Sequence, residues 1–188
     1  MKTRDPRYET IKPLFDQGEI TVFRDIFTFV PLRILAKDLG KKTKRLTELV
    51  EHVEELKVEE IVLIGSFCKF TLKEMFSLLE PVYPPAPENT LEKNDLQKYQ
   101  IVRVVFDEKK INFLEDIFSY IPRSSVAADL GKNRSGFTKK IRTQIKKIPL
   151  KDLVLIGRYC NLSLAETFAL VEAEYQRQNA KNLPKGSK

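Results

Sequence analysis

The residues best suited to chemistry are the cations between Arg123 and Lys151. This segment holds nine Lys/Arg and one acidic residue, Asp129. Its centre, "KNRSGFTKKIR" at 132–142, also carries amide and hydroxyl side chains. Lys and Arg neutralise phosphates, and Asn and Arg can hydrogen-bond base edges. The segment therefore predicts contact with a nucleic acid, and the competing interpretation is a solvated helix face.

Residues that would serve an enzyme or a metal site are sparse. No nucleophile motif, phosphate-cradling glycine loop or paired-carboxylate pattern occurs, and His52 has no partner at a catalytic spacing. One histidine with Cys68 and Cys160 does not make a zinc site of the usual spacing. We expect no enzymatic activity, no cofactor and no metal, and we interpret both cysteines as free core thiols. So few cysteines predict a reducing, cytoplasmic compartment.

The net charge of +7 is unevenly spread along the 188 residues. Residues 1–90 hold 14 Lys/Arg against 15 Asp/Glu, whereas residues 91–188 hold 19 against 11. Clustered cations attract anionic partners, so the second half is the expected binding half. No apolar run approaches the ~18 residues of a membrane span. The start, "MKTRDPRYET", has no apolar core, so we expect neither a signal peptide nor membrane insertion.

The chain is an internal duplication. Tyr8–Tyr83 aligns with Tyr99–Tyr175 at an offset of 91 residues, which becomes 92 after an insertion near Pro149. "DIF" and "DLGK" recur in both copies, and "IVLIGSFC" matches "LVLIGRYC". The predicted organisation is an N-terminal tail (1–7), repeat 1 (8–83), a linker (84–98), repeat 2 (99–175) and a basic flexible tail (176–188).

Apolar spacing predicts an all-α protein, with two homologous lobes of five to six helices. In repeat 1 the expected helices are 8–17, 22–29, 32–39, 43–54 and 58–69, with a short one from 71. "IVLIGSFC" could be a buried strand, but it would have no partner strand, so we predict a helix. "TLKE" and "SLAE" are capping boxes that start a later helix in each copy. Gly65 and Gly157 would let a neighbouring helix approach closely.

A small residue four positions before a glycine occurs in both copies, at Ala36 with Gly40 and at Ala127 with Gly131. The small residue would allow two helices to cross closely, and the glycine would adopt the left-handed turn conformation. We number the helix pair from Leu32 in repeat 1 and from Arg123 in repeat 2. Apolar residues at positions four, eight, fifteen and eighteen complete the pattern: Leu35, Leu39, Leu46 and Leu49 in repeat 1. Repeat 2 has Val126, Leu130 and Phe137, but Lys140 occupies position eighteen, with Ile141 beside it.

This order of helices resembles the phage-repressor (lambda Cro-like) helix-turn-helix domain over residues 30–80 and 121–172. Each whole repeat is also similar to a tandem helix-turn-helix family of bacterial and mobile-element proteins, through its "GEI…F.DIF..IP…A.DLGK" opening. The resemblance implies DNA binding, with the second helix of each pair in the major groove. Repressor-type domains often have a phosphate-binding Gln at the first position, where this chain has Leu32 and Arg123. Gly136 is a second departure, because it either admits a close backbone approach or frays its helix.

The predicted function is a transcriptional regulator or DNA-maintenance factor that binds duplex DNA mainly through repeat 2. Phosphate contacts are expected from Lys132, Lys139, Lys140 and Arg142, and base contacts from Asn133 and Arg134. The full predicted DNA-binding set is Arg123, Lys132, Asn133, Arg134, Ser135, Thr138, Lys139, Lys140 and Arg142, with Lys42, Thr43 and Lys44 in repeat 1.

The matched positions in repeat 1 also include two carboxylates, Glu48 and Glu51, which oppose phosphate binding. Repeat 1 is therefore expected to bind DNA weakly, or to serve a homodimer or a protein partner. The alternative function is a protein-interaction module on a scaffold that has lost DNA binding. RNA in place of DNA is a third interpretation that the sequence leaves open.

Overall fold

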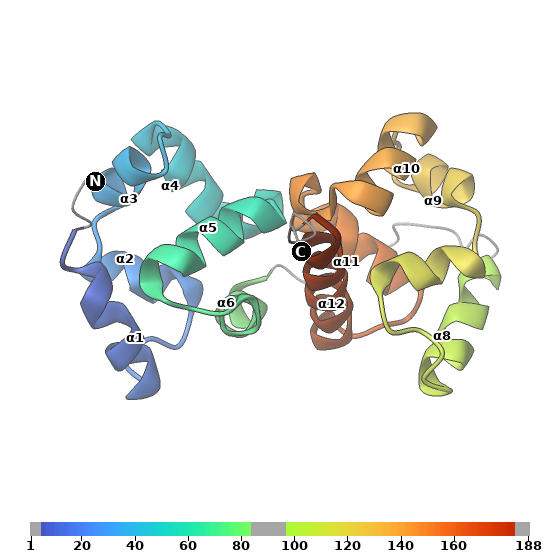
Figure 1. Ribbon diagram of the computed structural model, residues 1–188, viewed down its shortest axis with the longest axis horizontal. Helices are drawn as coiled ribbons and strands as arrows, with labels where there is room; N and C mark the ends of the chain where they lie inside the picture. Colours follow the sequence, from blue (N-terminus) through green and yellow to red (C-terminus); the bar gives the residue numbers. More distant parts are fainter. Residues whose placement is uncertain (1–4, 84–96, 183–188) are drawn as a thin grey trace, which may run out of the picture. The chain divides into compact units, whose positions relative to one another are not determined.

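The computed structural model describes residues 5–83 and 97–182, and the chain divides into two compact units at Pro84. We call the described part of each unit lobe 1 and lobe 2. Every regular element in these two ranges is a helix, which confirms the all-α prediction (Figure 1). The expectations for residues 1–4, for linker residues 84–96 and for residues 183–188 lie outside the described ranges.

Both lobes repeat one order of helices. Lobe 1 contains α1 (Tyr8–Asp16), η1 (Phe23–Asp25), α2 (Ile26–Phe29), α3 (Leu32–Asp38), α4 (Thr43–Glu51), η2 (Val53–Glu55), α5 (Val58–Cys68), α6 (Leu72–Leu79) and η3 (Glu80–Val82). Lobe 2 contains η4 (Gln97–Tyr99), α8 (Gln100–Asp107), η5 (Leu114–Ser119), α9 (Arg123–Asp129), α10 (Arg134–Thr143), η6 (Ile145–Lys147), α11 (Leu150–Tyr159) and α12 (Leu164–Asn182). Elements marked η are 3₁₀ turns. In each lobe the pair α3–α4 or α9–α10 lies at the end opposite the first long helix (Figure 1).

The ambiguous "IVLIGSFC" segment is helical, as predicted, and forms most of α5. Ile61, Ile64 and Cys68 are fully buried along it. The helix supplies its own backbone hydrogen bonds, which a lone strand could not do. The next helix then starts at the predicted capping box: the Glu74 backbone N–H donates to Thr71 Oγ1 at 3.2 Å, and the Thr71 N–H donates to Glu74 Oε2 at 2.7 Å.

The Ala–Gly pattern has the expected geometry in both helix pairs. Ala36 and Ala127 are buried, and Gly40 and Gly131 have positive φ angles of 65° and 62°. A Cβ at either glycine would meet no atom within 4 Å, so the requirement is one of backbone conformation and not of space. In lobe 2 the side chain of Ile141 fills the core while Lys140 is exposed, which explains the imperfect pattern at position eighteen.

Two polar contacts within the lobes recur at matched positions. The Tyr8 hydroxyl donates to Asp38 at 2.9 Å, and the Tyr99 hydroxyl donates to Asp129. Burial, followed by this hydrogen bond, raises the pKa of Tyr8, so the phenol keeps its proton. These contacts tie the start of α1 to the end of α3, and η4 to the end of α9. The aspartate before each turn glycine therefore has a structural partner.

The "DIF" aspartates also have matched roles. Asp25 accepts the backbone N–H of Val22 at 2.9 Å, and Asp116 accepts that of Phe113 at 2.9 Å. Hydrogen bonds from the Thr21 and Val22 backbones lower the pKa of Asp25. The carboxylate thus stabilises the start of each short helical turn before the helix pair.

Two predicted boundaries are wrong in detail. The helix expected over 43–54 ends at Glu51, where His52 adopts φ −120° and ψ 71°, and a separate turn, η2, follows. Residues 176–182, expected as flexible tail, continue α12 as a helix. The physical reason is the proline content of the matched segments: the sequence after α6 has Pro81, Pro84, Pro85 and Pro87, whereas their counterparts in α12 are Ala173, Gln176, Arg177 and Asn179. Proline disrupts a helix interior and alanine favours it, so only the second copy runs on.

No single described helix is both long and apolar enough to cross a bilayer. Helices α11 and α12 meet that test of length and composition only when joined, and they are bent by 120° at the break between them.

The glycines of α5 and α11 lie where a second helix crosses closely, as predicted. A Cβ at Gly157 would lie 2.9 Å from both Cβ and Cγ2 of Thr167 on α12, and nearer still to its Oγ1. At Gly65 the nearest atom would be Cγ of Met75, a flexible side chain, at 2.9 Å.

We predict that Gly157→Ala lowers the free energy of unfolding by about 1–3 kcal/mol through overpacking. Thr167 is branched at Cβ and cannot move aside easily. Gly65→Ala serves as the matched control and should cost less, because Met75 can change rotamer. Urea denaturation followed by circular dichroism measures both variants. A larger loss for Gly65→Ala than for Gly157→Ala would contradict this account.

The two cysteines are buried free thiols at matched positions, which confirms their assignment to the core. Burial raises the pKa of each thiol to about 12.

We predict that the native protein resists thiol reagents at mildly alkaline pH, while the urea-unfolded chain reacts at both sites. Between about pH 9 and 12 the folded state retains protons that the unfolded state loses, so stability should fall as the pH rises. Rapid labelling of the native protein would contradict the burial of these thiols.

Candidate nucleic-acid interface

Helix α10 and the last turns of α12 line an open groove of about 1060 Å³ on lobe 2. Helix α10 begins just after the left-handed turn at Gly131, and its apolar side is anchored by Phe137 and Ile141. The opposite side therefore faces solvent. The groove is lined by Glu115, Asn133, Arg134, Ser135, Thr138, Lys139, Arg142, Thr143, Arg177 and Lys181. Six of these are residues that the sequence predicted for DNA contact.

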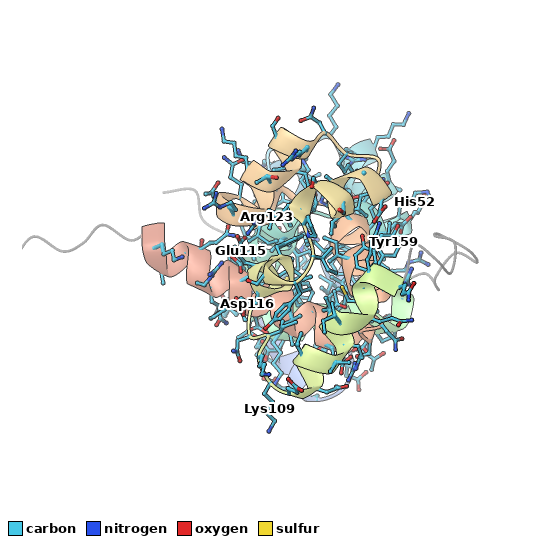
Figure 2. The ribbon with its side chains drawn as sticks, turned by 90° about the vertical axis from the view of Figure 1, so that its right-hand side faces the viewer. His52, Lys109, Glu115, Asp116, Arg123 and Tyr159 are labelled. Atoms are coloured by element: carbon cyan, nitrogen blue, oxygen red, sulfur yellow. The ribbon has the colours of Figure 1, made fainter. Side chains whose placement is uncertain are left out.

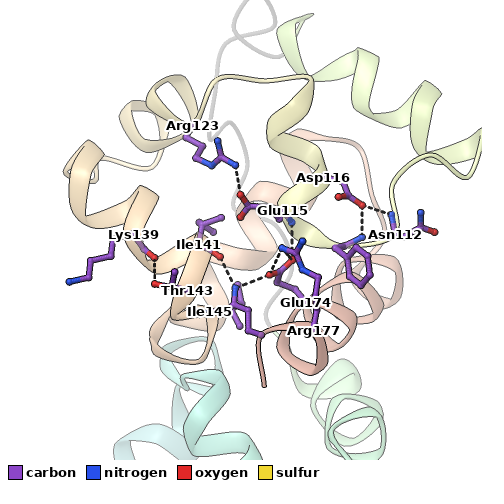
Figure 3. Close-up of polar contacts among 12 residues, drawn as sticks. Asn112, Glu115, Asp116, Arg123, Lys139, Ile141, Thr143, Ile145, Glu174 and Arg177 are labelled. Carbon is purple, nitrogen blue, oxygen red and sulfur yellow. Dashed lines mark hydrogen bonds and ion pairs between the residues drawn. The ribbon is translucent and has the colours of Figure 1, made fainter. Parts of the chain in front are cut away.

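Three groove cations are free to meet a ligand. Arg134, Lys139 and Arg142 are exposed and form no ion pair within residues 5–83 and 97–182. The Lys139 side chain extends away from the lobe in Figure 3. Lys140 faces a second, smaller hollow of about 200 Å³ that it shares with Lys132 and Phe137. The residues of α10 that the sequence predicted for DNA contact are thus divided between two sides of the helix.

Arg123 has a partner inside the lobe. Its guanidinium forms an ion pair with Glu115 (Figure 3). It also lies 5.2 Å from the centre of the Phe118 ring. This pair joins η5 to the start of α9. It also offsets the charge of Glu115, which is the one carboxylate among the residues that line the groove.

Lys132 has a structural contact that recurs in both lobes. Its ammonium lies 3.0 Å from Asp152 at the start of α11, and the matched Lys41 lies 2.5 Å from Glu60 in α5. The recurrence indicates that the lysine after the turn glycine holds the helix pair against the next helix. Lys132 is therefore the predicted phosphate ligand that is least available for a phosphate.

Asn133 is the N-cap of α10. Its Oδ1 accepts the backbone N–H of Gly136 at 3.1 Å and the hydroxyl of Ser135 at 2.8 Å. This satisfies a backbone donor that the first turn of a helix leaves free. A Cβ at Gly136 would approach only Asn133 Oδ1, at 3.8 Å, so packing within the lobe does not require the glycine. The helix continues regularly through it to Thr143.

Two groove residues, Arg177 and Lys181, were not predicted from the sequence, because they fall in the segment expected as a flexible tail. They are four residues apart and therefore on one side of α12. The available signal was the absence of proline at Ala173, together with cations repeating at helical spacing.

A buried polar network holds this part of α12 against α10. Gln178 Nε2 donates to the Ile141 carbonyl at 2.8 Å, and its Oε1 accepts the Ile145 backbone N–H at 3.0 Å. The same amide donates to Glu174, which is fully buried and accepts Arg177 at 2.8 Å (Figure 3). Gln178 thus satisfies backbone groups at the end of α10 that would otherwise lack partners.

The equivalent surface of lobe 1 is less basic. Lys42, Thr43 and Lys44 are exposed at the start of α4, as predicted. Glu48 and Glu51 stand where lobe 2 has Lys139 and Arg142, and Glu48 pairs with Arg45 at 3.4 Å. The helix after α5 stops at Leu79, so its last turns do not extend as those of α12 do.

The described ranges contain no group of three or more His, Cys, Asp or Glu side chains that could hold a metal ion. His52 is exposed, and its Nδ1 lies 3.4 Å from Glu54. Comparison with protein-family models, curated proteins and solved structures found no match to this chain.

The cap assignment of Asn133 can be tested by stability. We predict that Asn133→Ala lowers the free energy of unfolding by about 1 kcal/mol, while Asn133→Ser retains most of it. The matched control is Lys42→Ala, because the side chain of Lys42 makes no cap hydrogen bond to α4. Urea denaturation measures all three variants. Equal losses for Asn133→Ala and Lys42→Ala would argue against the cap.

Proposed function

We propose that the protein binds duplex DNA through lobe 2, with α10 as the principal contact helix. The observation that carries the proposal is the open groove, which is lined by cations from two helices: Arg134, Lys139, Arg142, Arg177 and Lys181. Its one lining carboxylate, Glu115, is neutralised by Arg123. Such a surface attracts a polyanion over its whole length.

The helix pair is consistent with the helix-turn-helix resemblance seen in the sequence. A left-handed turn at Gly131 and a buried Ala127 set α9 and α10 against one another, and α10 presents its polar side outward. In this interpretation the N-terminal half of α10 enters the major groove. Arg134 is the candidate for contacts with base edges, since arginine pairs with guanine there. Asn133 is a weaker candidate because its Oδ1 caps the helix.

The biological role that fits is a transcriptional regulator or a DNA-maintenance factor. Lobe 1 shares the scaffold but carries carboxylates at two of the contact positions, Glu48 and Glu51. We assign it weak DNA affinity or a partner-binding role.

A protein-binding role has one separate observation in its favour. Ile101 and Val104 are three residues apart on α8, and their exposed fractions are 46% and 54%. Large apolar side chains that share an exposed helix face suit a protein contact. This surface lies on a different helix from the basic groove, so both functions can coexist.

The DNA proposal predicts the salt dependence of binding to a random-sequence duplex, measured by fluorescence anisotropy. Lys139→Gln should weaken binding, and the slope of log K against log salt should become shallower by about 0.9, since one phosphate contact is lost. Lys44→Gln, the control on α4, should change the slope less. Equal effects at both lysines would contradict the assignment to lobe 2. No binding by the wild-type protein at low salt would contradict DNA binding itself.

A further inference from the structure

The end of α12 is the feature that most distinguishes the two lobes. In lobe 1 helix α6 ends at Leu79 and is followed by η3, which contains Pro81. In lobe 2 the residue matched to Pro81 is Ala173, and α12 continues to Asn182. Two cations on this extension, Arg177 and Lys181, line the groove across from α10. The extension therefore adds a second basic wall that the helix pair alone would not have.

This second wall is held rigidly to the first. The Gln178 amide joins the Ile141 carbonyl of α10 to the Ile145 backbone N–H at the start of η6. Glu174 is fully buried, and one of its oxygens also accepts the Glu115 backbone N–H at 3.3 Å. Buried, fully partnered polar groups fix geometry because breaking one leaves another unsatisfied. The distance between the walls is consequently set by the fold.

The two cations of the wall, Arg177 and Lys181, differ in how available they are to bind a phosphate. Arg177 donates to Glu174 from Nη2, so part of its charge is compensated inside the lobe. Lys181 is exposed and has no ion pair within the described part of the chain. Lys181 is thus the free cation of the extension, and Arg177 lies one turn before it on the same side of the helix.

We propose that the α12 extension binds the sugar–phosphate backbone of the same duplex that α10 contacts, so that one strand lies between two helices. This inference rests on the proposed function. Duplex DNA carries a phosphate charge about every 1.7 Å of helix axis, so a wall beside the contact helix meets phosphates whatever the base sequence. Contacts from Lys and Arg to phosphates fix the position of the protein on the duplex and carry no direct sequence information.

The test is a salt titration of full-length protein on two labelled duplexes of different sequence. Lys181→Gln should weaken binding to both duplexes equally and make the salt slope shallower by about 0.9. The matched control is Lys109→Gln, which removes an exposed lysine at the end of the lobe opposite α10 (Figure 2). It should leave the slope near that of the wild type. An unchanged slope for Lys181→Gln overturns the inference.

Lys139→Gln on α10 separates this inference from the proposed function. If Lys139→Gln flattens the slope and Lys181→Gln does not, DNA binding by α10 stands and the second wall is wrong. If neither variant differs from the wild type, both proposals fail. A loss confined to one of the two duplexes for Lys181→Gln would also overturn the inference, because it would indicate base reading.

Ala173→Pro tests the extension as a whole by giving lobe 2 the residue found in lobe 1. It should flatten the slope at least as much as Lys181→Gln, since both extension cations lose their positions. Circular dichroism checks that the lobe still folds. If it does not fold, Lys181→Gln alone decides the outcome, because that side chain is exposed and makes no ion pair with the described residues. A folded Ala173→Pro protein with wild-type binding overturns the inference.

Discussion

The crossing of α11 and α12 at Gly157 is the contact on which lobe 2 depends. Only a residue without a side chain allows Thr167 to approach so closely, and this sets the direction in which α12 leaves the core. Because α12 runs in that direction, Glu174 and Gln178 lie beside the end of α10. The position of the second wall of the groove, on α12, therefore depends on this one close approach.

Much of this architecture was predictable because it depends on local chemistry repeated in two copies. Capping boxes, turn glycines and helical spacing each act within a few residues, so "TLKE" and Gly131 could be assigned correctly. The roles of Arg123 and Lys132 could not, because each depends on a carboxylate brought near by tertiary packing. The sequence shows that both residues are charged. It does not show whether a carboxylate nearby in the fold already compensates that charge.

The two lobes share their internal contacts and differ on their surfaces. The Tyr–Asp hydrogen bond and the Lys–carboxylate ion pair occur in both, so the duplicated frame is held by the same interactions. Differences such as Glu48 against Lys139 lie on exposed faces, where substitutions change stability little. Surface charge can therefore change in one copy while the packing that supports it stays the same.

The proline after α6 has a consequence for the history of the gene. Proline and alanine codons share their second base and differ in their first, so a single base change is sufficient to convert one residue into the other at such a position as Pro81 or Ala173. Here the two copies differ by substitution and not by length: Pro81, Pro84, Pro85 and Pro87 stand where the second copy has Ala173, Gln176, Arg177 and Asn179. The two copies therefore differ in the length of this helix while their residue register is kept.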